Sequence, residues 1–128
     1  MTAQKAAAIE TLNWQNVCEV SDLVAGGGIC ALLGREQVAI FYEPADAQLY
    51  AISNFDPLGG AAVLSRGILG SLGARTVVAS PLFKHHFDLE TGECVEEPAH
   101  SLRVFPVRAV DSLVQVAIDP EPGPIPVD

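Results

Sequence analysis

The sequence predicts a small all-β domain, and three observations lead to that class. Short apolar runs alternate with turn signals rich in Gly, Pro, Asp and Asn. No stretch carries the sustained apolar periodicity of an amphipathic helix. The chain has 128 residues, of which 49% are hydrophobic, so it is long enough to bury a core. This combination is typical of an antiparallel β-sandwich or barrel.

The expected strands follow one another as hairpins. We expect an Ala-rich extension over residues 1–12, a folded domain over 13–118 and a Pro-rich extended or disordered tail over 119–128. Pro106 predicts an edge or a bulge within the penultimate strand. Apolar runs bounded by turn residues predict strands at 29–33, 38–42, 48–53, 68–72, 76–79, 86–89, 102–110 and 113–118.

The charge balance excludes some classes of partner. The chain has 16 acidic and 7 basic residues, and the formal net charge is −9. Such a surface repels nucleic acid and acidic membranes, so no partner of either kind is expected. No secretory signal and no apolar run of about 20 residues is visible, so we expect a soluble cytoplasmic protein. The charge serves solubility or, alternatively, docking to a basic face of a partner.

The cysteines predict a reduced compartment and no disulfide framework. Cys18, Cys30 and Cys94 are scattered, and no pair has C-x-x-C spacing. We expect each to be a small buried hydrophobic residue. Cys94 has an alternative, because it follows a Gly turn and could be exposed. The acidic run 93–97, expected to be a solvated turn, would then raise its pKa.

Two loops carry the most specific pattern in the chain. The first contains Asn54-Phe55-Asp56-Pro57, and the second contains Ser80-Pro81-Leu82-Phe83. This layout resembles the Rieske iron–sulfur domain, whose loops read C-x-H and C-P-x-H and whose two Cys and two His hold a [2Fe–2S] cluster. The four ligand positions are occupied here by Asn54, Asp56, Ser80 and Phe83. None of these supplies a soft thiolate or an imidazole, so the frame is kept and the ligands are missing.

That combination resembles the small subunits of assimilatory NAD(P)H-dependent nitrite reductases, which are Rieske-like and lack the cluster. The resemblance runs from about Trp14 to Ile118 and is carried by residues 14–18, 49–57, 64–68 and 78–89. It implies an antiparallel β base with a small loop subdomain at one end. It also implies a large-subunit partner that carries FAD, an iron–sulfur cluster and siroheme, and reduces nitrite to ammonium. The chain itself would hold no cofactor and no catalytic residue, and would assemble or stabilise that partner.

The vacated loops have two interpretations. They are either framework retained for packing or a docking surface, for which the candidates are Arg66, Leu82, Phe83, Lys84 and His85. We expect the Phe83 ring to fill the space that a cluster would occupy, since an empty cavity is costly. Asn54 and Asp56 are expected to cap backbone amides of the first loop.

Other site classes find little support. Adjacent residues on a strand point to opposite faces, so His85 and His86 are not expected to chelate one metal, and no zinc spacing is present. The glycines at 26–28 lack the pattern of a phosphate loop. Two alternative functions stay open. One is a Rieske-type ferredoxin that carries electrons through unexpected ligands, and the other is a stand-alone interaction module for another oxidoreductase.

Overall fold

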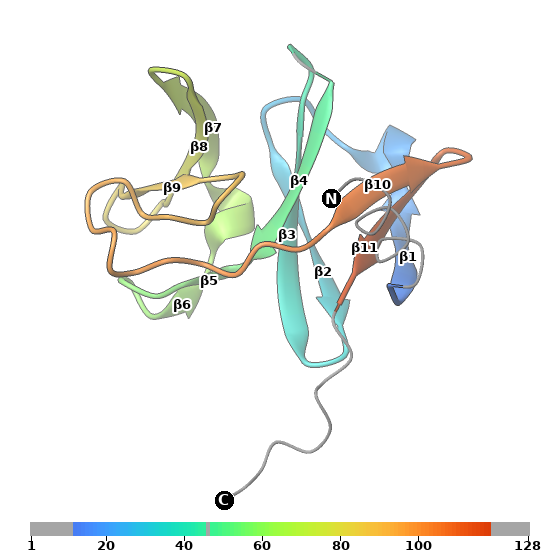
Figure 1. Ribbon diagram of the computed structural model, residues 1–128, viewed down its shortest axis with the longest axis horizontal. Coiled ribbons are helices and arrows are strands. Elements are labelled where there is room, and N and C mark those ends of the chain that lie inside the picture. Colours follow the sequence, from blue (N-terminus) through green and yellow to red (C-terminus); the bar gives the residue numbers. More distant parts are fainter. Residues whose placement is uncertain (1–11, 46, 119–128) are drawn as a thin grey trace, which may run out of the picture.

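The computed structural model describes residues 12–45 and 47–118, which form antiparallel sheets with two short 3-10 turns (Figure 1). The expected all-β class is confirmed. The tail and all but Leu12 of the N-terminal extension lie outside the described residues. The elements are β1 (Trp14–Glu19), η1 (Val20–Asp22), β2 (Gly28–Leu33), β3 (Glu36–Glu43), β4 (Gln48–Ser53), β5 (Phe55–Asp56), β6 (Ala61–Ala62), η2 (Leu64–Arg66), β7 (Ile68–Leu72), β8 (Arg75–Ala79), β9 (His86–Asp88), β10 (Val107–Val110) and β11 (Leu113–Ala117).

A middle sheet in the order β2-β3-β4 separates the other two parts of the domain. The four consecutive residues at 38–41 of β3 are all 0% exposed. Successive side chains of a strand point to opposite faces, so full burial of the run means that both faces of this sheet are covered. Val38 and Ile40 belong to one apolar cluster, and Ala39 and Phe41 belong to the other.

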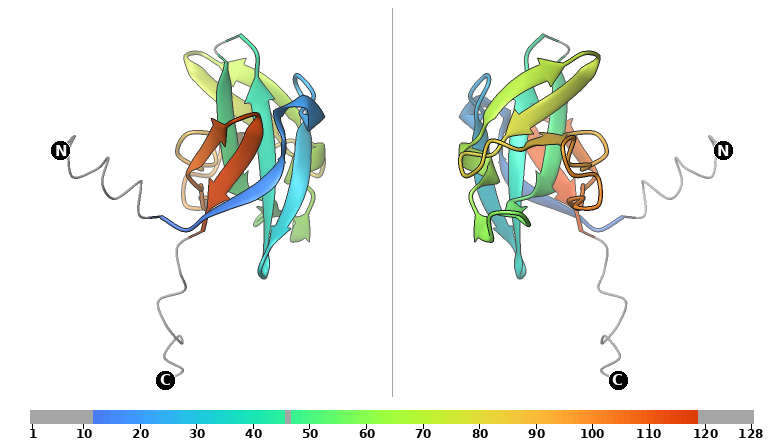
Figure 2. Two further views of the ribbon diagram at one scale, coloured as in Figure 1. Left: turned by 90° about the vertical axis from the view of Figure 1, so that its right-hand side faces the viewer. Right: turned by 90° about the vertical axis from the view of Figure 1, so that its left-hand side faces the viewer.

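The sheet β1-β11-β10 covers one face, and the elements β5 to β9 cover the other (Figures 1 and 2). The first cluster lies under the β5–β9 part, which is the expected loop subdomain; its buried members are Ala39, Phe41, Tyr50, Ile52, Leu64, Val78, Phe87, Leu89, Cys94 and Leu102. The second lies under β1, β10 and β11; its buried members are Leu33, Val38, Ile40, Ala51, Phe105, Val114 and Val116. Trp14 pairs with Ala117, so the domain begins and ends at neighbouring positions.

The single strand expected over 102–110 is wrong. Only Val107–Val110 forms a strand, which pairs with β11. Before it, the chain runs beside β4, where the Ser53 N–H donates to the Arg103 carbonyl at 2.9 Å and the Phe105 N–H donates to the Ala51 carbonyl at 2.8 Å. Pro106 lies between the segment that is bonded to β4 and the strand β10, which pairs with β11. It has no N–H with which to continue the ladder on β4. The segment therefore leaves β4 there and moves to the other sheet.

Candidate functional site

Asn54 connects the first loop to the middle sheet and to η2. Its Oδ1 accepts from the Ser65 N–H at 2.6 Å, and its Nδ2 donates to Gln37 Oε1 at 3.2 Å. A weaker contact of 3.5 Å joins Nδ2 to Cys30 Sγ. The side chain is 2% exposed, so these bonds satisfy a buried amide. The expected capping role of Asn54 is confirmed, and Gln37 and Cys30 are partners that the sequence did not indicate.

Asp56 and Ser80 join the two loops directly. Both residues are 0% exposed, and Ser80 Oγ donates to Asp56 Oδ2 at 2.5 Å. The other carboxylate oxygen accepts from the N–H groups of Leu58 at 2.8 Å and Gly59 at 3.1 Å, which confirms the expected cap. We call this the Asp56–Ser80 link. A buried carboxylate that was left without such partners would carry a large desolvation penalty.

The second loop is a tight turn whose first and last residues are hydrogen-bonded to each other. The Ser80 N–H donates to the His85 carbonyl at 2.9 Å, and the Lys84 N–H donates to the Ser80 carbonyl at 3.1 Å. Ser80 Oγ also accepts from the Leu82 N–H at 3.2 Å. Lys84 has a φ of 63°, in the left-handed region that favours glycine. These bonds close the turn at its base, and residues 81–84 at its end are all exposed.

The expectation that Phe83 fills the vacated space is wrong. Phe83 is 67% exposed and points away from the core. The Asp56–Ser80 link occupies the position between the loops instead. Leu82 packs back on the first loop, because a Cβ placed on Gly59 would overlap the Leu82 side chain.

The four positions do not suit an iron–sulfur cluster. Their polar atoms are oxygens and an amide nitrogen, and those of Asn54, Asp56 and Ser80 are engaged in the hydrogen bonds described above. Phe83 offers no donor atom at all. Iron in a Rieske centre needs thiolate and imidazole ligands. Elsewhere in residues 12–45 and 47–118, no group of three or more His, Cys, Asp or Glu side chains could hold a metal ion.

A second buried carboxylate stabilises the turn after β9. Asp88 is 6% exposed, and its Oδ1 accepts from the N–H groups of Glu90 at 2.7 Å and Thr91 at 3.1 Å. Arg75 bonds Asp88 Oδ2 through Nε at 2.8 Å and Glu93 Oε1 through Nη2 at 2.6 Å. Burial works to raise the pKa of Asp88, but the Arg75 bond and the two N–H groups outweigh it and lower the pKa. The acidic run 93–97, expected to be merely solvated, is therefore partly paired.

The two adjacent histidines have separate environments. His86 Nδ1 lies 2.6 Å from Glu96 Oε2, and the His86 N–H donates to Glu96 Oε1 at 2.8 Å. Burial works to raise the pKa of Glu96, but these bonds from His86 outweigh it and lower the pKa to about 2. His85 is half-buried, and its Nδ1 has no hydrogen-bond partner within the described part of the chain.

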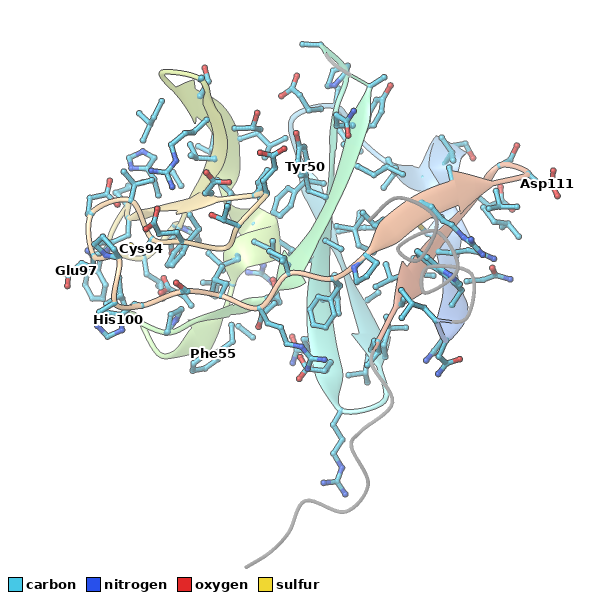
Figure 3. The ribbon with its side chains drawn as sticks, in the orientation of Figure 1. Tyr50, Phe55, Cys94, Glu97, His100 and Asp111 are labelled. Atoms are coloured by element: carbon cyan, nitrogen blue, oxygen red, sulfur yellow. The ribbon has the colours of Figure 1, made fainter. Side chains whose placement is uncertain are left out.

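The expected burial of the cysteines is confirmed for Cys94 and wrong for Cys30. Cys94 is 0% exposed inside the loop subdomain, so the alternative of an exposed thiol after the Gly turn is wrong (Figure 3). Burial is the largest cause that raises the pKa of its thiol. Cys30 is exposed at the surface of β2, which contradicts its expected burial. Cys18 is half-buried, which falls short of its expected burial, and all three cysteines are free.

The candidate docking residues gather around the second loop. Arg66 ends η2 and precedes Gly67, at which a Cβ would lie 2.5 Å from the Ala79 carbonyl oxygen, so η2 lies against the beginning of the second loop. Arg66, Leu82, Phe83 and Lys84 are exposed. His85 is less accessible. We call the exposed residues Arg66 and Pro81–Lys84 the tip.

The sheets and the two facing loops define a Rieske-like domain. Residues 13–117 match the Rieske-like [2Fe-2S] domain family, and the chain belongs to that family. It is 45% identical over 103 residues to the nitrite reductase (NADH) small subunit of Salmonella typhimurium, covering 80% of this chain and 95% of that one. The chain thus belongs to the nitrite reductase (NADH) small subunits.

Two further similarities bear on fold and partner. The solved structure of the Escherichia coli protein NirD has a TM-score of 0.75 and 41% sequence identity, with 81% of this chain and 94% of that chain covered. The nitrite reductase [NAD(P)H] large subunit of Klebsiella oxytoca is 35% identical over 114 residues, which are 89% of this chain and 12% of that protein. Within the described residues, no helix is long and apolar enough to span a membrane.

Proposed function

We propose that this chain is the non-catalytic subunit of an NAD(P)H-dependent assimilatory nitrite reductase and acts by binding and stabilising the large subunit. The similarity to part of the Klebsiella oxytoca large subunit carries this proposal. A domain like this chain forms a small share of that polypeptide and is there attached to the rest of it. Two separate chains that correspond to parts of one chain in a relative are expected to associate.

In this proposal, no electrons pass through the small subunit. The support is the chemistry of positions 54, 56, 80 and 83, which provide no thiolate or imidazole. FAD, the iron–sulfur cluster and siroheme would all reside on the large subunit, where nitrite is reduced to ammonium. Free cysteines suit a reducing compartment, so we place the complex in the cytoplasm.

Reconstitution with the separately purified large subunit tests the proposal. The expected result is a complex of defined mass and a higher thermal stability of the large subunit when the chain is present. NADH-dependent formation of ammonium from nitrite should last longer in the complex. A chain that leaves the mass, the melting temperature and the lifetime of activity unchanged would exclude the subunit role.

Metal analysis separates this function from that of an electron carrier. We expect neither iron nor acid-labile sulfide after anaerobic purification of the folded chain. Close to two irons and two sulfides per chain would instead establish a ferredoxin, since that is the composition of one [2Fe–2S] cluster.

A further inference from the structure

We propose that the tip is the docking element of this chain and that it fits an apolar hollow with an acidic rim on the large subunit. This inference rests on the proposed function and specifies its surface. It differs from the expectation that net charge alone suggests, because a chain of net charge −9 would be expected to seek a basic partner.

The first support is apolar exposure at the end of the second loop. Phe83 is 67% exposed and Leu82 is 39% exposed. Aromatic side chains that are exposed on a rigid loop are typical anchors of protein interfaces, because they bury a large area and lose little conformational entropy. The nearby Pro81 is also exposed and limits the freedom of the loop further.

The second support is the charge beside these residues. Arg66 and Lys84 are exposed, and neither side chain has an ion-pair or hydrogen-bond partner in residues 12–45 and 47–118. Three other arginines are engaged: Arg75 with Asp88 and Glu93, Arg103 with Glu36, and Arg108 with Gln115. Arg35, in the turn between β2 and β3, is exposed and likewise has no side-chain partner within the described ranges. The tip thus combines two unpaired cations with exposed apolar side chains. A complementary surface presents acidic groups around an apolar centre.

The third support is the backbone at Lys84. A φ of 63° is unfavourable for a residue with a Cβ and suits glycine. Among the described residues, positive φ also occurs at five glycines and at three other non-glycine residues, namely Ala47, Asp111 and Ser112. Lys84 is the cationic residue among these four and lies in the second loop, where its backbone costs stability, so its side chain is expected to serve something other than the fold. The Asp56–Ser80 link holds the base of the loop, so the projection is arranged before it binds.

The decisive variant is Lys84→Gly, because its effects on folding and on binding are expected to have opposite signs. Glycine relieves the unfavourable φ, so the melting temperature of the free chain should stay the same or rise. Binding to the purified large subunit, measured by titration calorimetry, should weaken. The double variant Arg66→Glu/Lys84→Glu should weaken it by about tenfold or more at low salt, and the difference should shrink as salt rises.

Matched controls lie on the β2–β3 hairpin. Arg35 is exposed and has no side-chain partner within the described ranges, so Arg35→Glu repeats a charge reversal away from the tip. Leu32 is 69% exposed, close to the value for Phe83, so Leu32→Ala controls Phe83→Ala. We expect Phe83→Ala to weaken binding by about thirtyfold and both controls to change it by less than about threefold.

The outcomes separate the two proposals. If the unaltered chain does not bind the large subunit, the proposed function itself fails. If it binds and the tip variants bind as tightly as the control variants, the subunit role stands and the tip is not the docking element. If charge reversal at the tip strengthens binding, the facing surface is basic and the inferred acidic rim is wrong.

Discussion

Asp56 and Ser80 illustrate how single residues replace a metal centre as the connection between two loops. A Rieske cluster joins its loops through four ligands. Here one carboxylate accepts from two loop amides and from the Ser80 hydroxyl of the opposite loop. All of these groups are buried or partly buried, so the bonds are not weakened by competing water. The loops therefore keep a fixed relation through hydrogen bonds alone.

Removing the hydroxyl of Ser80 tests this link. Ser80→Ala leaves the buried Asp56 carboxylate with one partner fewer, and we expect the free energy of unfolding to fall by about 1–3 kcal/mol. Urea denaturation of the free chain measures it, with the exposed Ser71→Ala on β7 as the control. Phe83→Ala should change stability by less than about 0.5 kcal/mol, as for other exposed sites. If Ser80→Ala and Ser71→Ala lower the free energy of unfolding equally, the Asp56–Ser80 link does not contribute to stability.

The Glu96–His86 pair makes a prediction for acid conditions. The pKa of Glu96 falls from 4.5 to about 2 in the folded chain. A carboxylate with a lowered folded pKa adds stability that is fully present above the unfolded pKa and is lost as the pH falls through the folded value. The urea midpoint of the unaltered chain should therefore exceed that of Glu96→Gln at pH 6, and the gap should close between pH 4.5 and about 2.

The effect should be small, because the Glu96 side chain is 41% exposed and water screens the pair. Glu97→Gln is the control, since the Glu97 side chain makes no hydrogen bond to another described residue. A midpoint gap for Glu96→Gln that does not depend on pH would contradict the assignment.

Residue chemistry was predictable where a side chain acts on its own backbone. Asp at the start of a turn commonly caps nearby amides, and Asp56 does so for Leu58 and Gly59. Asn54 instead caps the Ser65 N–H in η2, a partner that local turn chemistry does not predict. The direction of Phe83 was not predictable, because a one-residue change in turn geometry decides whether a ring faces the core or water. The exposure of Cys30 depends on how far the loop subdomain extends over β2, which is also a tertiary property.

At the scale of elements, the close contact between η2 and β8 fixes the start of β7. A Cβ on Gly67 would lie 2.5 Å from the Ala79 carbonyl oxygen and 2.7 Å from Val78 Cγ2. The obstructing oxygen is backbone and cannot turn aside as a side chain would. We expect Gly67→Ala to lower the free energy of unfolding by about 1–3 kcal/mol through this overlap.

Gly70, in the middle of β7, provides the matched control. No heavy atom lies within 4 Å of a Cβ placed there, so Gly70→Ala should be neutral or slightly stabilising. Thermal unfolding of the two variants side by side gives the comparison. If they melt together, the packing of η2 against β8 does not constrain the fold.

Most strands followed from turn residues and apolar runs, and β4 and β7 begin and end where they were predicted. The segment before Pro106 was predicted wrongly, because its apolar residues and those of β10 look like one continuous strand in the sequence. It is divided between two sheets, because Val104 bridges to Ile52 of β4 whereas Val107–Val110 pair with β11. Sequence patterns report which residues favour extended backbone, whereas the choice of partner strand depends on distant elements.

At the scale of the whole molecule, β3 joins the two cores. Ala39 and Phe41 pack under the loop subdomain, and Val38 and Ile40 pack under β1, β10 and β11. The two cores therefore pack on opposite faces of the same strand. If one core lost its packing, β3 would be left with one uncovered face, and the strand that supports the other core would be weakened. We therefore expect the described domain to unfold as one cooperative unit, although the chain contains two apolar clusters.

Two natural probes report on the two sides separately. Trp14, the only tryptophan of the chain, begins β1, and Cys94 is buried in the loop subdomain. In a Cys18→Ser/Cys30→Ser background, Trp14 fluorescence and the thiol reactivity of Cys94 should change at the same urea concentration. A core variant on either side, Val114→Ala or Phe87→Ala, should move both transitions equally, since each removes buried volume from a shared unit. Loss of Cys94 protection before the Trp14 transition would show instead that the loop subdomain opens by itself, and the tip would then be a mobile element rather than a rigid one.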